Sequence, residues 1–364
     1  MRVIIVNGSP RKGGYTSDLI QWFRKGLESQ GATVFEVLLR KSRITPCIGC
    51  FKCWVGDTAG RCIFSDDMDG ILETYMTSDA IVLATPMYYY SFSSLMKIFV
   101  ERLFPTCQPG LDKGGALGLG RNRPRHPGKG PSKAVLIASC GLHNPRTMHA
   151  LVSTFDLVCD AIAAIPVGRL LRPESNLLDF EQAKPRTLRR VRQAFESAGR
   201  ELVRDGAVSE KTEAEAMLRF TLSEEIFATH FETYWTIASE MGSKWIDRHQ
   251  LAEVTNKDPR IIVRELASYF SPKAAGDLKA VIQFNLVDTE DGAWQLMIDN
   301  GTCRAVAGVH SAPDLTMTMT QDVFLGVALQ RVSAREAFQR KLILTEGSPE
   351  LLARFVRIFP RPVT

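Results

Sequence analysis

The N-terminal stretch, residues 1–19, places the tightest constraint on the fold. An unbroken apolar run, Val3–Val6, is typical of a strand buried on both faces of a parallel sheet. A segment rich in Gly, Ser and Pro, Asn7–Gly14, then ends the strand, and apolar residues recur at helical spacing from about Thr16. This geometry can bind a phosphate, because free backbone N–H groups and the positive end of the helix dipole point into the loop. The alternative is an ordinary turn between a strand and a helix.

The loop does not match the two best-known phosphate motifs. Lys12 precedes the glycines and no Lys-Ser or Lys-Thr pair follows them, so neither GxGxxG nor GxxxxGK[ST] fits. We therefore predict a site for the phosphate of a mononucleotide.

Further apolar runs predict the rest of a sheet. They lie at 33–38, 79–85 and 133–139, with helical patterns between them, and residues 105–132 read as a long loop. Apolar strands that alternate with helices indicate a doubly wound parallel α/β sheet. In such a sheet the ligand binds beyond the carboxyl ends of the strands, at the switch point in strand order. The loops at 8–16, 86–91 and 139–143 all follow predicted strands, so we expect them to converge on one ligand.

This combination resembles the flavodoxin-like NAD(P)H-dependent FMN reductase family over about residues 1–245. The residues that carry the resemblance are Gly8–Arg11, Thr16, Pro46–Cys50, Asp66–Met68, Thr85–Tyr88 and Lys97. The resemblance implies a flavoprotein that passes electrons from NAD(P)H through bound FMN to a small-molecule acceptor, for example a quinone-like or other apolar substrate. It implies no catalytic side chain, because the flavin carries the chemistry.

The resemblance also implies the contacts of the flavin. The FMN phosphate would lie against Ser9, Arg11, Thr16 and Ser17, next to Tyr15, where the family usually has Asn. One face of the flavin ring would lie against Pro86, Met87, Tyr88 and Tyr89. Its pyrimidine edge would lie against Ser139, Cys140 and Gly141. His143, which follows closely, either approaches the ring or lies in a solvated loop.

Four of the eight cysteines, Cys47, Cys50, Cys53 and Cys62, form a C-x2-C-x2-C-x8-C motif. Thiolates at such short spacing can ligate an iron–sulfur cluster. The motif resembles that of the iron–sulfur flavoprotein branch of the family, which holds a 4Fe–4S cluster, although the last gap is longer here. Zinc and metal-free thiols beside the flavin are the alternatives, and the spacing does not decide among the three.

The last third of the chain changes pattern. Alternating strands at 280–287 and 293–298, a hairpin signal at Asp299-Asn300-Gly301, strands at 305–309 and 315–320 and then helices predict an α+β domain. It resembles the sterol-carrier-protein (SCP-2-like) fold, which encloses a tunnel for lipid-like ligands. Residues that would line the tunnel, or else fill a solid core, are Met297, Met317, Met319, Phe324 and Phe338. We therefore predict three segments: residues 1–210 bind FMN, 211–258 are a helical extension and 259–364 bind an apolar ligand.

Composition bounds the remaining functional classes. A net charge of +5 is mild and scattered, so nucleic acid is not an expected partner. No apolar run approaches the roughly 20 residues that span a membrane, and the first residues read as a strand, so we expect neither a membrane span nor a signal peptide. Eight cysteines without such a signal favour a cytoplasmic protein with reduced thiols, and the resemblance implies a homo-oligomer. The rival hypotheses are a lipid carrier with a non-catalytic flavodoxin-like module and an iron–sulfur electron carrier.

Overall fold

The computed structural model describes residues 1–112, 121–179, 185–221, 223–240, 258–328 and 332–360. The chain divides into two compact units. The N-terminal unit comprises Met1–Leu178 and Arg186–Phe220, and the C-terminal unit comprises Asp179–Pro185 and Thr221–Thr364. Each unit has its own five-stranded sheet and its own core.

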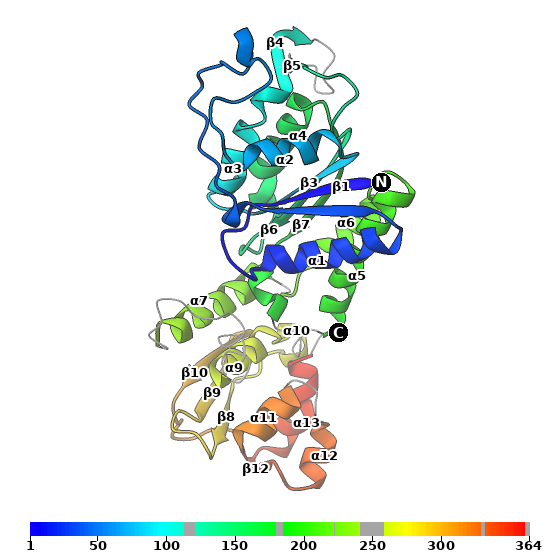
Figure 1. The fold of residues 1–364 in the computed structure, drawn as a ribbon. Helices are drawn as coiled ribbons and strands as arrows, with labels where there is room; N and C mark the ends of the chain where they lie inside the picture. The colour runs from blue at the N-terminus through cyan, green and yellow to red at the C-terminus, as the bar shows by residue number, and fades with distance from the viewer. Residues whose placement is uncertain (113–120, 180–184, 222, 241–257, 329–331, 361–364) are drawn as a thin grey trace. The chain divides into compact units, whose positions relative to one another are not determined.

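The N-terminal unit is built on a parallel sheet in the order β2-β1-β3-β6-β7 (Figure 1). Its strands are β1 (Arg2–Asn7), β2 (Thr33–Leu38), β3 (Ala80–Pro86), β6 (Lys133–Ser139) and β7 (Ile165–Arg172). Every neighbouring pair is parallel. This is the flavodoxin-like order, in which the direction of strand addition reverses between β1 and β3. The fold class predicted from the sequence is confirmed.

Two features of this unit differ from the sequence prediction. Strand β7 was not predicted, because Pro166, Gly168 and Arg169 interrupt its apolar residues, and its position at the edge of the sheet tolerates them. The segment predicted as a long loop, 105–132, contains a two-stranded antiparallel sheet of β4 (Cys107–Asp112) and β5 (Arg121–Pro124).

Helices cover both faces of the parallel sheet (Figure 1). One face carries α1 (Tyr15–Ser29) and α5 (Pro185–Arg204), and the other carries α2 (Met68–Met76), α3 (Ser94–Glu101) and α4 (His149–Ala161). Helix α6 (Glu210–Ala216) contacts β7. Short 3₁₀ turns lie at Leu39–Lys41, Gly56–Thr58, Phe104–Thr106, Pro145–Met148 and Ser175–Asp179.

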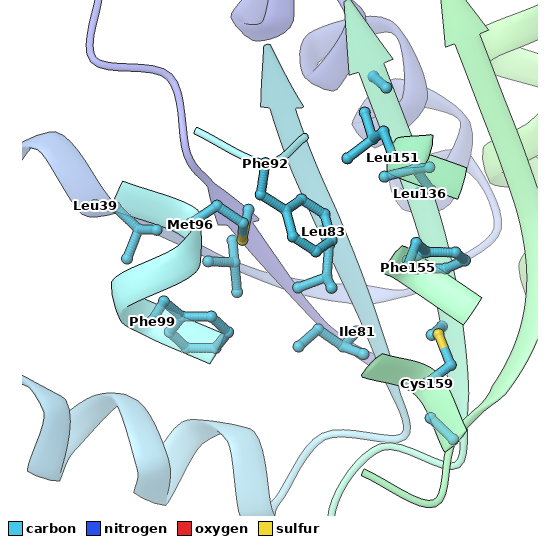
Figure 2. Packing of buried hydrophobic residues seen from close by; sticks show 14 of the residues in the cluster. Leu39, Ile81, Leu83, Phe92, Met96, Phe99, Leu136, Leu151, Phe155 and Cys159 are labelled. Carbon is cyan, nitrogen blue, oxygen red and sulfur yellow. The ribbon is translucent and has the colours of Figure 1, made fainter. Parts of the chain in front are cut away.

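The core between the sheet and the second helical layer is apolar and closely packed. Figure 2 shows Met96 and Phe99 of α3 and Phe155 of α4 over Ile81 and Leu83 of β3. All five side chains are fully buried. Burial of each large apolar side chain stabilises the folded protein by roughly 1.5–3 kcal/mol. The packing also fixes the carboxyl ends of the strands, where the loops of the site begin.

The C-terminal unit has a mixed sheet in the order β10-β9-β8-β11-β12. Its strands are β8 (Ala280–Leu286), β9 (Ala293–Asp299), β10 (Thr302–Ala307), β11 (Leu315–Met319) and β12 (Leu344–Gly347). The predicted hairpin is present, with Asn300 and Gly301 both at positive φ. The strands do not all pair in chain order, because β11 pairs in parallel with β8 and not with β10.

The helices of this unit are α7 (Glu224–Glu240), α9 (Pro259–Ser268), α10 (Pro272–Ala275), α11 (Gln321–Ala328), α12 (Ala334–Gln339) and α13 (Pro349–Ile358). In the described part of the chain, no helix is both long and apolar enough to cross a membrane.

Candidate functional site

Direct hydrogen bonds join the loops that follow β1, β3 and β6. The N–H of Gly8 donates to Ala84 O at 2.8 Å, and Ser93 Oγ donates to Gly8 O at 2.7 Å. The N–H of Met87 donates to Ser139 O at 2.8 Å. The hydroxyls of Thr16 and Ser139, both buried, lie 2.8 Å apart. The three loops thus meet at the carboxyl edge of the sheet, beside the switch point between β1 and β3.

The loop after β1 has the features of an anion site. Gly14 precedes α1 and no side chain caps the helix, and the start of a helix favours an anion. Ser9 is buried, and its Oγ accepts from the Arg11 N–H at 3.3 Å, which leaves its own proton to donate. A Cβ at Gly14 would lie 3.2 Å from Ser9 Oγ, so a larger residue there would crowd the loop.

The side chains of the first turn of α1 have protein partners as well. Tyr15 Oη donates to Asn176 O at 3.5 Å, which directs this residue toward the segment after β7. Ser17 Oγ accepts from Asn7 Nδ2 at 3.5 Å. Because Thr16 and Ser139 share one hydrogen bond, one of their two hydroxyl protons remains available for a ligand.

The loop after β3 ends in a tight turn made of tyrosines. Tyr88 and Ser91 exchange both backbone hydrogen bonds, at 3.2 and 3.1 Å. Tyr89 and Tyr90, between them, both have positive φ, a conformation that large side chains rarely adopt. Tyr89 is fully exposed and Tyr90 is 53% exposed. The turn therefore holds aromatic rings at the surface in a strained backbone conformation. Strained residues of this kind are often found at ligand sites.

The residues of the loop after β6 differ in how open they are to a ligand. Cys140 is buried, its N–H donates to Arg172 O at 2.9 Å, and its Sγ accepts from the Leu142 N–H at 3.3 Å. Its own amide is therefore already used within the protein. A Cβ on Gly141 would meet no atom within 4 Å, so Gly141 is the open position of this loop.

A buried polar network supports the same loop. His143 is 4% exposed, so it is not a solvated loop histidine. Its Nδ1 lies 2.7 Å from Glu174 Oε1, and its Nε2 lies 3.0 Å from a guanidinium nitrogen of Arg219. Because Arg219 can only donate, the neutral ring accepts at Nε2 and donates from Nδ1 to the carboxylate. The sequence pointed to His143 but gave no sign of these two partners.

The four cysteines of the motif line one small pocket between β2 and α2. Ile48, Phe51, Phe64, Arg102 and Phe104 complete most of its wall. Burial raises the pKa of the Cys53 thiol, and the neighbouring thiols raise it further, Cys62 most. Among the described residues, no three His, Cys, Asp or Glu side chains lie close enough together to hold a single metal ion.

A buried ion pair adjoins this pocket, since Arg102 lines its wall. Arg102, 1% exposed at its side chain, donates from both terminal nitrogens to Asp66, at 2.7 and 3.0 Å. Asp66 also accepts from the backbone N–H groups of Thr45 and Met68. Burial opposes the charge on Asp66, but the Arg102 guanidinium and these N–H groups outweigh it and lower the pKa of the carboxyl to about 2.

The C-terminal unit contains a larger cavity, of about 530 Å³, with a mostly apolar wall. Of the predicted lining residues, Met317, Met319, Phe324 and Phe338 are present in this wall. Met297 does not line it, because it stands one residue out of phase with the inward-facing Leu296 and Ile298 of β9. The cavity has the size and polarity of small-molecule binding pockets.

Comparison with known proteins gives a match for each unit. Residues 1–168 match the family described as NADPH-dependent FMN reductase. The resemblance predicted from the loops of the first unit is confirmed. Residues 259–363 match the family described as alkyl sulfatase C-terminal.

Individual proteins are similar to shorter parts of the chain. An iron-sulfur flavoprotein of Archaeoglobus fulgidus is 36% identical over 105 residues, which are 29% of this chain and 46% of that protein. An iron-sulfur flavoprotein of Methanocaldococcus jannaschii is 32% identical over 126 residues, 34% of this chain and 64% of that protein. The chain thus spans less than two thirds of the length of either relative. Palmitated SCP2L2 from Aedes aegypti is 20% identical, with a TM-score of 0.23, and the match covers 27% of this chain and 88% of that one.

Proposed function

We propose that the protein is an FMN-dependent oxidoreductase that takes electrons from NAD(P)H and passes them to a small-molecule acceptor. The observation that carries the proposal is the convergence of the loops after β1, β3 and β6 at the switch point of a flavodoxin-like sheet. The match of residues 1–168 to NADPH-dependent FMN reductases supports it.

The chain's own residues provide binding and orientation. The uncapped start of α1, Ser9 and the spare proton of the Thr16–Ser139 pair fit a phosphate, and Arg11 adds a positive charge. The Tyr88–Ser91 turn offers an aromatic surface and Gly141 an open backbone for the two sides of a flat ring. When bound, FMN supplies the hydride acceptance and the onward electron transfer.

Substituting Thr16 by Val should weaken FMN binding by about tenfold or more, because it removes one buried hydrogen-bonding group from the proposed phosphate site. The measurement is titration of the protein with FMN, followed by quenching of flavin fluorescence, with NADH and NADPH oxidation assayed in parallel. Ser78→Ala is the matched control. Ser78 is also buried and hydrogen-bonded, but it precedes β3 at the opposite edge of the sheet.

Wild-type protein and the Ser78→Ala variant should bind FMN equally and oxidise a reduced nicotinamide nucleotide. A wild-type protein that binds no FMN would refute the flavin site. FMN binding without any oxidation of NADH or NADPH would instead favour the lipid carrier with a non-catalytic flavodoxin-like module.

We also propose that Cys47, Cys50, Cys53 and Cys62 hold a 4Fe–4S cluster. All four line one pocket, and thiolates at this spacing in the chain can ligate such a cluster. The curated relatives named above are iron-sulfur flavoproteins. None of the eight cysteines forms a disulfide, which fits a reducing compartment such as a cytoplasm.

A second activity is favoured by the cavity of the C-terminal unit, which we propose binds a molecule with a long alkyl chain. The wall is formed by aliphatic, aromatic and Met side chains, which adapt to a flexible apolar ligand. An apolar electron acceptor and a carried lipid are both of this class.

Substituting Ala328 by Trp should abolish binding of a fluorescent fatty acid, because the indole would fill the cavity that Ala328 lines. The readout is the increase in fluorescence when the probe enters an apolar site. Val309→Trp is the control, since Val309 is 74% exposed in the same unit and does not line the cavity. Undiminished binding by the Ala328→Trp variant would place the ligand elsewhere.

A further inference from the structure

The side chain of Arg102 is buried, and only some of its N–H groups have hydrogen-bond partners. Its two terminal nitrogens donate to Asp66, and one of them also donates to Thr45 O at 2.6 Å. Among the residues that the structure describes, Nε has no hydrogen-bond partner, although the side chain is only 1% exposed. A buried N–H group without an acceptor is costly, so this donor is available to an acceptor that the protein chain does not itself supply.

The surroundings of Arg102 indicate what this acceptor is. Arg102 lines the pocket formed by the four cysteines, and its guanidinium lies 5.5 Å from the ring centroid of Phe64, in the same wall. Cys62 and Cys47 are close enough to interact electrostatically with the guanidinium. The unpartnered donor thus belongs to a cationic side chain beside a set of sulfur ligands, and cluster sulfurs accept hydrogen bonds.

We propose that Arg102 donates its Nε–H to a sulfur of the group held by the four cysteines, and thereby raises the reduction potential of that group. The inference rests on the proposed iron–sulfur cluster. A reduced cluster carries one more negative charge than an oxidised one, so a fixed donor and a nearby cation stabilise the reduced form more. Asp66 acts as the positioning residue, because its two oxygens fix the plane of the guanidinium.

Arg125 provides an internal comparison. It also contacts the cysteine loop, through donation from a terminal nitrogen to Cys53 O at 3.0 Å. Its Nε donates to Pro105 O at 3.2 Å, so this donor is already used. Arg125 anchors the loop, whereas Arg102 has a donor left for the group inside the pocket.

The test compares the full-length protein with the variants Arg102→Lys and Arg125→Lys, all reconstituted anaerobically with iron and sulfide. Lysine keeps the positive charge opposite Asp66 but has no Nε–H to donate to a sulfur. The readout is the midpoint potential of the cluster, from a redox titration followed by electron paramagnetic resonance. We expect Arg102→Lys to lower the equilibrium constant for reduction about tenfold, which is about 59 mV for a one-electron couple. Arg125→Lys should shift the potential less than Arg102→Lys does, because the Nε of Arg125 already donates to Pro105 O.

An unchanged potential in Arg102→Lys would overturn the inference, and would mean that Nε–H binds water instead. If that variant loses the cluster, pulsed electron paramagnetic resonance of the wild-type protein, labelled with ¹⁵N-arginine, tests the inference instead. Coupling of ¹⁵N to the reduced cluster supports the inference, and no coupling overturns it. A wild-type protein without iron and sulfide overturns both this inference and the cluster. FMN content and NAD(P)H oxidation, measured on the same sample, report separately on the proposed oxidoreductase.

Discussion

Substituting Gly199 by Ala should destabilise the N-terminal unit by about 3 kcal/mol, because α1 and α5 cross with their backbones in contact. A Cβ on Gly199 would lie 2.2 Å from Phe23 O, and a Cβ on Gly26, the facing residue, would lie 2.0 Å from Glu196 O. Both obstacles are backbone atoms, which cannot rotate away as a side chain can. Relief therefore requires the two helices to move apart, and this weakens the packing of the whole layer.

The expected destabilisation by Gly199→Ala is opposite in sign to the usual effect of replacing Gly by Ala in a helix, so the test can separate the two. Away from contacts, replacing Gly by Ala within a helix stabilises the helix by about 1 kcal/mol. Gly70 of α2 is exposed, and a Cβ there would meet no atom within 4 Å, so Gly70→Ala should stabilise the protein or leave it unchanged. The measurement is urea denaturation followed by circular dichroism, in which only the transition of the N-terminal unit should shift. Equal shifts for Gly199→Ala and Gly70→Ala would show that the helices do not pack as closely as described.

The same substitution has a consequence for the proposed flavin site. Helix α1 begins at Tyr15, directly after the loop that we propose binds phosphate, and Thr16 joins it to β6. A displacement of α1 at Gly26 would shift this first turn. FMN affinity should therefore fall in Gly199→Ala, although Gly199 lies on another helix and far along the chain from the loop.

Much of the N-terminal unit can be predicted from the sequence because its central strands are buried on both faces. Val3–Val6 and Ala80–Ala84 are unbroken apolar runs for this reason, and each is followed by a polar loop. Strand β7 contains Pro166 and Gly168, so no such run marks it. Its place in the sheet depends on pairing with β6, which no local pattern contains.

The second unit shows the same limit. The alternating residues of Leu315–Met319 predict a strand, but they do not tell which strand lies beside it. The structure pairs β11 with β8, which leaves β10 at the edge of the sheet. Met297 was expected either to line the cavity or to fill a core because of its residue type, whereas its phase in β9 directs it away from the cavity.

The candidate site was predictable where residues adjacent in sequence act together, and not where distant residues meet. The loops after β1, β3 and β6 follow from the positions of the strands, and the cysteine motif is contiguous. Arg102 is partly predictable, because it is the C-cap residue of α3 and follows the buried Phe99 by three residues, which places it on the same side. Its partner Asp66 lies 36 residues away, and only the fold brings the two together.

Substituting Asp66 by Asn should destabilise the N-terminal unit by about 3–5 kcal/mol, because it leaves the Arg102 cation buried without its counter-charge. The amide also cannot accept from all the donors that now reach the two carboxylate oxygens, the N–H groups of Thr45 and Met68 among them. Denaturation by urea at neutral pH measures the effect. Asp205→Asn is the control, since Asp205 pairs with Arg204 on the exposed surface, where an ion pair contributes little.

The same carboxylate predicts an acid transition. The pKa of Asp66 is about 2 in the folded protein, against an ordinary value of 3.8. Because the pKa is lower in the folded protein, the ionised Asp66 contributes about 2.5 kcal/mol to the free energy of unfolding. This contribution is fully present above pH 3.8 and is lost as the pH falls toward 2. The Asp66→Asn variant has no such group, so its stability should fall less than that of the wild type over this interval. The difference between the two proteins should therefore narrow on acidification, and a constant difference from pH 6 to pH 2 would show that the Asp66 pair does not carry this stability.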